Sequence, residues 1–121
     1  MTRTLFLMRH AKAEAHDPRS DFNRKLSSRG WQQAEEAGRV LADRGIQLVL
    51  CSSSARTRQT YEGLGLKLPG GEPVPVQYME ALYLGSADLI RQRIGEITDD
   101  ITELLVIGHS TAIPTLAAEL A

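Results

Sequence analysis

The sequence has a single cysteine, few aromatic residues and almost no net charge. One cysteine, Cys51, excludes an intrachain disulfide framework and a zinc cluster ligated by cysteines. The 14 Lys and Arg residues against 15 Asp and Glu residues leave a formal net charge of −1. Because no basic stripe stands out, we expect no nucleic-acid partner recognised through bulk charge. The same balance leaves room for a small anion held by a few local arginines.

Long hydrophobic runs are missing too. The apolar run at residues 5–8 is too short, and is interrupted too soon, for a signal peptide or a membrane span. We therefore expect a cytoplasmic protein without a membrane partner, and a lone cysteine agrees with that reducing compartment. The length of 121 residues predicts one domain over residues 1–121, and 42% hydrophobic residues suffice for a core.

Apolar runs recur along the chain and predict the strands of a sheet. The strands are expected at residues 4–8, 46–52 and 103–110. Prolines place a further extended piece, residues 73–79, at a sheet edge rather than at its centre. Because helical segments alternate with these strands, we expect an α/β fold, a three-layer α/β/α sandwich with a mostly parallel central sheet.

The first expected helix follows a polar loop at residues 12–25. Ser27 or Ser28 can cap its start, and Gly45 supplies its stop. One face of this helix is apolar and is expected to be buried, with Trp31, Ala34, Ala37, Val40 and Leu41. Further helices are expected within residues 53–66, 81–98 and 111–121.

Polar residues follow three of the predicted strands. Arg9 and His10 end the first, residues 52–56 follow the second, and His109 follows the last. Since ligands bind at the carboxyl ends of parallel strands, these groups are expected to meet at one edge of the sheet. Two guanidiniums match the oxygens of a phosphate, and a neutral imidazole is a competent nucleophile toward phosphorus. Nothing in this scheme needs a metal or another cofactor.

Three segments carry a resemblance to a known family. "LMRHAKAE" resembles the Arg-His-Gly motif of the histidine phosphatase superfamily, which includes the phosphoglycerate mutases. "CSSSARTRQT" and "LLVIGHST" resemble its second-arginine motif and its second-histidine strand end. The small size, "DFNRKLSSRGWQQA" and the "LY" after Glu80 look most like the SixA-type phosphohistidine phosphatases. The resemblance implies a phosphoglycerate mutase-like fold.

The resemblance also implies roles for the residues that match. His10 would be the nucleophile that becomes phosphorylated, and Arg9, Arg56 and His109 would clamp the phosphate. Glu80 occupies the place where many members of the superfamily carry their proton donor. From the residues alone, a glutamate there could simply cap a helix.

Further assignments concern the loop before the first helix. Asp21 and Glu14 could supply the acid in place of Glu80. Arg24 lies in an Asp-x-x-Arg-x-Leu stretch typical of the SixA branch, which implies that it reaches the substrate or its phosphate. We leave the identity of the general acid open at this point.

The chain departs from the family pattern in three places. Ala11 replaces the usual glycine, and Ser53 stands where proline is expected, although Arg56 stays in register. Relatives continue with further strands after the helix that follows His109, so this sequence resembles either a shortened version or one truncated at the C-terminus. The oligomeric state is left open.

Cys51 offers a rival nucleophile. Cysteine-dependent phosphatases place an arginine after five intervening residues, and here that position is Thr57. Arg56 is one residue too early and Arg58 one too late. We therefore interpret Cys51 as the buried end of a strand.

These observations predict a metal-independent phosphatase that works through a phosphohistidine intermediate. The chain has little room for insertions around the site, which favours a phosphate displayed on a protein, such as phosphohistidine. A phosphomonoesterase acting on a sugar or nucleotide phosphate is the alternative enzyme, and a phosphate-binding module without turnover is the alternative of another class.

Overall fold

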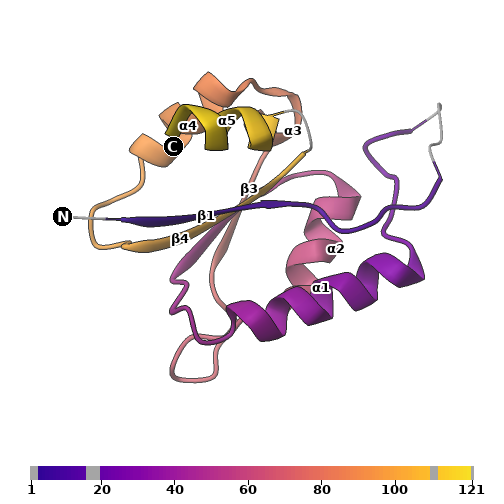
Figure 1. Cartoon of the computed structure of the whole chain (residues 1–121), viewed down its shortest axis with the longest axis horizontal. Helices are drawn as coiled ribbons and strands as arrows, with labels where there is room; N and C mark the ends of the chain where they lie inside the picture. The colour runs from indigo at the N-terminus through magenta and orange to yellow at the C-terminus, as the bar shows by residue number, and fades with distance from the viewer. Residues whose placement is uncertain (1–2, 16–19, 110–111, 121) are drawn as a thin grey trace.

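In the part of the chain that the structure describes, the fold is built from four strands, each followed by one or two helices. The computed structural model describes residues 3–15, 20–109 and 112–120, and Figure 1 shows the arrangement of its elements. In chain order these are β1 (Thr4–Arg9), α1 (Ser28–Leu41), β2 (Leu48–Ser52), α2 (Ala55–Leu64), β3 (Val76–Met79), α3 (Ala81–Leu84), α4 (Ala87–Gly95), β4 (Glu103–Gly108) and α5 (Ala112–Leu120).

The four strands form one parallel sheet in the order β1-β4-β2-β3. The two inner strands, β4 and β2, are those whose sequences are apolar on both faces, as a sheet covered on both sides requires. The strand that follows the prolines, β3, lies at an edge, which confirms the prediction for this segment.

Helices cover both faces of the sheet (Figure 1), so the predicted three-layer sandwich is confirmed. On one face, Leu50 and Val106 pack with Leu82, Ile90 and Leu116 of α3, α4 and α5. On the other face, alternate residues of the same strands pack toward the α1 and α2 side, with Val49, Leu105, Ile107 and Leu64 among them. The alternation of side chains along each strand produces these two separate cores.

The first helix begins where the sequence predicts it and ends earlier. The Ser27 hydroxyl accepts a hydrogen bond from the Gly30 amide at 3.1 Å, which is an N-cap interaction. The helix ends at Leu41, and Gly45 instead lies in the following turn with a φ of 71°. The loop before α1 is closed by a bridge between Ala13 and Leu26, and its residues 16–19 lie outside the described ranges, as do residues 110–111.

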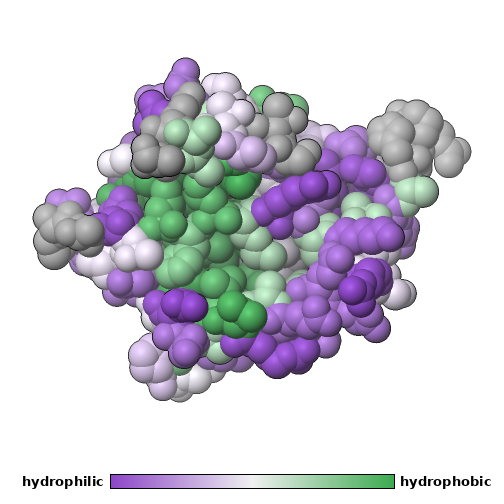
Figure 2. Space-filling model, viewed as in Figure 1, coloured by the Kyte–Doolittle hydropathy of each residue, from purple (hydrophilic) through white to green (hydrophobic). Residues whose placement is uncertain are grey.

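An apolar groove of about 580 Å³ runs along the outer side of β1. Figure 2 shows it within the broad green area at the centre of the molecule. Residues 5–8 of β1 line it together with Ala37, Val40 and Leu41 of α1. The prediction that Val40 is buried is wrong, because 64% of its surface is exposed. Within the described residues β1 pairs with β4 alone, so β1 is an edge strand and the groove lies along a sheet edge.

No helix within the described ranges combines the length and the apolar character that crossing a lipid bilayer requires.

Candidate active site

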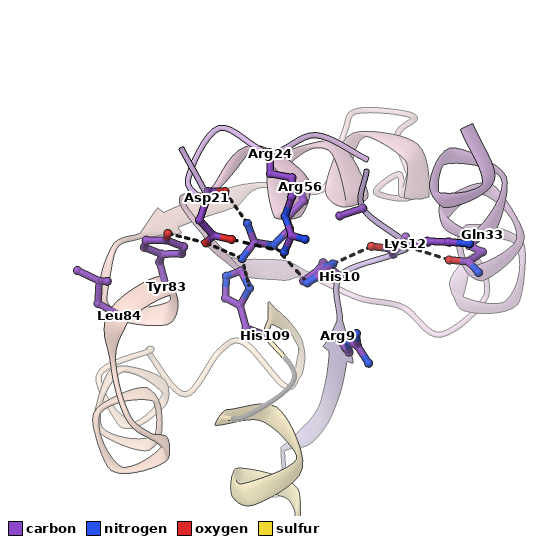
Figure 3. A pocket seen from close by; sticks show the side chains of 12 residues that line it. Arg9, His10, Lys12, Asp21, Arg24, Gln33, Arg56, Tyr83, Leu84 and His109 are labelled. Atoms are coloured by element: carbon purple, nitrogen blue, oxygen red, sulfur yellow. Dashed lines mark hydrogen bonds and ion pairs between the residues drawn. The ribbon is translucent and has the colours of Figure 1, made fainter. Parts of the chain in front are cut away.

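A pocket of about 810 Å³ opens at the carboxyl ends of β1, β4 and β2 (Figure 3). It is lined by His10, which follows β1, by Arg56 at the start of α2, and by His109, which follows β4. The parallel sheet thus brings together three of the groups that follow the predicted strands. The remaining lining residues come from the end of β1, from the loop before α1, from α1 and from α3.

His10 presents one ring nitrogen to the pocket. Its Nδ1 lies 2.7 Å from the carbonyl oxygen of Ala11, which can only accept, so Nδ1 carries the proton. Nε2 then keeps its lone pair and accepts a hydrogen bond from Arg56 Nε at 3.3 Å. Burial and the neighbouring guanidiniums, that of Arg56 first, lower the pKa of His10 below 6.5. The imidazole is therefore neutral at pH 7, as a nucleophile must be.

Arg56 connects the other groups of the site. Its side chain is only 6% exposed, and it donates to His10, to His109 Nδ1 at 3.3 Å and twice to Asp21. The two bonds to Asp21 reach its backbone oxygen at 2.8 Å and its carboxylate at 3.1 Å. Arg56 is the second residue of α2, so the positive end of the helix dipole lies beside it. The guanidinium of Arg56 and the dipole of α2 both favour an anion in the pocket.

His109 is held between Arg56 and the end of β2. Its Nε2 lies 2.8 Å from the Ser52 hydroxyl, and its ring centroid is 5.3 Å from that of His10. Burial lowers the pKa of His109 to about 4, with smaller contributions from Arg56 and His10. In the free protein, therefore, His109 is neutral and accepts a hydrogen bond from Arg56.

This pKa predicts that acid destabilises the folded protein over a defined range. Between about pH 6.5 and pH 4 the unfolded chain protonates His109 and the folded chain does not, so the free energy of unfolding falls as the pH decreases. His109→Gln removes this group while leaving His10, whose lowered pKa acts in the same direction. Urea unfolding at pH 7 and pH 5 should show a smaller loss of stability for the variant. Equal losses would contradict the prediction.

Asp21 is the one carboxylate among the described residues that line the pocket. Its Oδ2 accepts a hydrogen bond from the Tyr83 hydroxyl at 2.8 Å as well as the one from Arg56. Arg24 lies 3.5 Å from the other carboxylate oxygen. The Tyr83 hydrogen bond, together with Arg56 and Arg24, lowers the pKa of Asp21 below 3.8. The group is therefore ionised at pH 7.

The other two candidates for the acid lie elsewhere. Glu80 and Glu14 are exposed, and neither is among the residues that line the pocket. Glu80 stands at the start of α3, where its backbone oxygen accepts hydrogen bonds from the Tyr83 and Leu84 amides. Its side chain makes no capping hydrogen bond. The structure thus places Asp21, and not Glu80, in the pocket with His10, Arg56 and His109.

The two remaining arginines occupy different positions in the pocket. Arg9 is exposed at the rim, and Figure 3 shows its guanidinium turned away from His10, Arg56 and His109. Arg24 lies inside, and its Nε is buried with no hydrogen-bond partner, which is true of no other side-chain N or O atom in the described part of the chain. A buried donor without a partner calls for an acceptor. An oxygen of a bound phosphate would satisfy it.

The sequence predicts no individual role for two residues of the site. Ser52, which holds His109, is the last residue of β2 and belongs to the segment 52–56 that the strand-end rule places at this edge. Tyr83 lies in α3, and only the short "LY" match pointed toward it. Its ring makes edge contacts with His109, centroids 5.5 Å apart, and its hydroxyl holds Asp21.

The rival nucleophile lies away from the pocket. Cys51 is fully buried in β2, and burial raises the pKa of its thiol to about 12. A protonated thiol is a poor nucleophile. In the part of the chain that the structure describes, no three His, Cys, Asp or Glu side chains gather as a metal site.

Known proteins share both the sequence and the fold. A protein of Mycobacterium tuberculosis is 35% identical over 116 residues, which cover 94% of this chain and 70% of the relative. A structure from Nakamurella multipartitia, assigned to the SixA phosphohistidine phosphatases, is 36% identical with a TM-score of 0.86. The match covers 98% of this chain and 65% of that one, so the chain spans less than two thirds of this relative.

A further solved structure shows an oxyanion complex of such a protein. The protein histidine phosphatase SixA, complexed with tungstate, is 30% identical with a TM-score of 0.81, over 96% of this chain and 75% of that one. The model of the histidine phosphatase superfamily (branch 1) matches residues 5–83, well over half of the sequence. Together with the SixA-type fold, this match shows that the chain belongs to the histidine phosphatase superfamily.

Proposed function

We propose that the chain is a phosphatase that transfers the phosphoryl group of a protein phosphohistidine to His10 and then to water. The observation that carries the proposal is the orientation of the His10 ring, whose Nδ1 lies 2.7 Å from the Ala11 carbonyl oxygen while Nε2 is turned toward Arg56 in the pocket. In the first step the Nε2 lone pair forms a bond to phosphorus, and the bond from phosphorus to the substrate imidazole breaks. In the second step water attacks the phosphorus on His10, releasing phosphate and restoring the imidazole.

The charge of the transferring group is met by fixed donors. Arg56 and Arg24 supply guanidinium N–H groups, and the Nε–H of Arg24, which has no hydrogen-bond partner, can donate to an oxygen of the bound group. His109 would gain a proton as the dianion binds, because an anion raises the pKa of a neighbouring imidazole. The tungstate complex of the 30% identical relative supports an oxyanion as the ligand of this pocket, since tungstate is a tetrahedral oxyanion like phosphate.

The ionisation state of Asp21 decides which kind of leaving group the site favours. A serine or sugar phosphate ester needs an acid to protonate its alkoxide, and general acid catalysis contributes roughly 10²–10⁴-fold. Asp21 is ionised, and Glu80 and Glu14 lie outside the pocket. A phosphohistidine that is protonated on its other ring nitrogen leaves as a neutral imidazole and needs no acid. An ionised Asp21 suits the second step instead, as a base for the attacking water.

We therefore expect a strong preference for substrates that leave without a proton donor. Values of kcat/KM for a phosphohistidine protein and for phosphoramidate should exceed those for a methyl phosphate ester by roughly 10²–10⁴-fold. A nitrophenyl ester, whose nitrophenolate leaves without a proton, should also have a higher kcat/KM than the methyl ester. A phosphate-release assay across this panel measures the preference. Equal rates for the methyl ester and phosphoramidate would favour a small-molecule phosphomonoesterase.

A further inference from the structure

Exposed apolar side chains gather at one side of the phosphate pocket. Three large hydrophobic residues are exposed in the described part of the chain, and two of them, Phe22 at 40% and Leu84 at 71%, stand beside this pocket. Phe22 packs edge-on against Tyr83, with ring centroids 5.2 Å apart, and Leu84 is the next residue after Tyr83. We call Phe22, Tyr83 and Leu84 the apolar wall.

This wall lies across the site from the nucleophile. The ring centroids of His10 and His109 are 5.3 Å apart, and those of His109 and Tyr83 are 5.5 Å apart. Beyond Tyr83 lies Phe22, whose ring packs against that of Tyr83. Figure 3 shows the same order, with His10 on one side of Arg56 and His109, and Tyr83 and Leu84 on the other. Phosphoryl transfer needs the attacking and leaving atoms roughly in line through phosphorus. An in-line transfer to His10 across the space beside Arg56 and His109 would direct the leaving side of the substrate toward the wall.

A groove continues from the wall into the protein surface. A second cavity, of about 440 Å³, shares Tyr83, Leu84 and His109 with the phosphate pocket. It extends between α3 and α5, where the small residues Gly85 and Ala112 line it. A groove joined to the leaving side of the site has room for more than an imidazole ring.

We propose that the apolar wall and this groove bind the polypeptide that carries the phosphohistidine, and that they select an apolar residue next to it. The inference rests on the proposed function, since it concerns the leaving side of that reaction. The phosphate supplies charge for Arg56, whereas an apolar neighbour would cover Phe22 and Leu84 and remove their surfaces from water. Discrimination among substrates would then come from the wall, because the cationic part of the site binds any phosphate alike.

Serine variants of the two exposed residues test the proposal. Leu84→Ser and Phe22→Ser change exposed side chains, so both proteins should fold, which circular dichroism checks. With a phosphohistidine peptide that has leucine beside the modified residue, we expect Leu84→Ser to raise KM roughly tenfold, because most of a leucine contact is lost. The KM for phosphoramidate, which has no apolar leaving group, should stay within about twofold. Val40→Ser is the matched control, since Val40 is equally exposed but lies on the groove along β1.

The outcomes separate this inference from the proposed function. An unchanged KM for the peptide, an equal rise for phosphoramidate, or the same rise in Val40→Ser would overturn the role of the wall. A peptide with serine in place of the leucine should lose the difference between wild type and Leu84→Ser, and persistence of that difference would also overturn it. The proposed function fails separately, if the wild-type protein neither hydrolyses phosphoramidate nor carries phosphate on His10.

Discussion

Alanine in place of His10 is expected to reduce kcat/KM for a phosphohistidine protein by roughly four orders of magnitude or more. The variant loses the lone pair that attacks phosphorus, and no other described residue offers a neutral nitrogen in the same place. The wild-type protein should carry one phosphate on His10 after rapid quenching, detected by mass spectrometry of its peptides. The alanine variant should carry none.

Cys51→Ala is the matched control for this experiment. Cys51 is fully buried and its thiol stays protonated, so phosphate release should change little once folding is verified. Loss of activity in Cys51→Ala with activity retained in His10→Ala would transfer the nucleophile to the cysteine. If wild-type protein binds phosphate tightly but neither becomes labelled nor releases it from any substrate, the chain is a binding module.

Arg56→Lys is expected to cost about 10³-fold in kcat/KM although the charge is kept. A lysine ammonium is a point charge and cannot reproduce the fork that reaches His10, His109 and Asp21 together. His109 would lose its donor, and Asp21 would lose both of its hydrogen bonds from Arg56. Steady-state kinetics with phosphoramidate measure the loss in transition-state stabilisation.

Arg58→Lys provides the comparison for that variant. Arg58 lies two residues further along α2, donates to the Ser53 backbone oxygen at 2.8 Å and stacks over the Tyr78 ring at 4.0 Å. These contacts are outside the pocket, so the change should leave kcat/KM within a small factor of wild type. Similar losses in both variants would mean that the effect of Arg56 is structural.

Much of the site is predictable because the rules that apply to it are local. Apolar runs identify the strands, and parallel strands bring their carboxyl ends to one edge, which is enough to join His10, Arg56 and His109. Ser52 was within reach of the same rule, as the last residue of β2. The chemical role of each residue depends on its neighbours in the pocket, whereas its position at the sheet edge follows from the strand that it ends.

Other features depend on contacts that no local pattern contains. Glu80 lies at the start of α3 and Asp21 in the loop before α1, and only the path of that loop places Asp21 against Arg56 and Tyr83. Val40 has the correct period for burial, yet it is 64% exposed on the groove along β1, the edge strand of the sheet. Periodicity tells which side of a helix faces inward and cannot tell how far the facing layer extends.

The ion pair between Asp21 and Arg56 makes the protein carry an internal competitor for its own ligand. An oxyanion that approaches Arg56 must displace a carboxylate already 3.1 Å from the guanidinium, so it gains only the difference between the two interactions. Inorganic phosphate brings little beyond its charge and is therefore retained weakly, whereas a substrate with further contacts is less affected. If the proposed reaction takes place, we expect Asp21 to return to Arg56 when phosphate leaves, and this exchange would limit inhibition by the phosphate product.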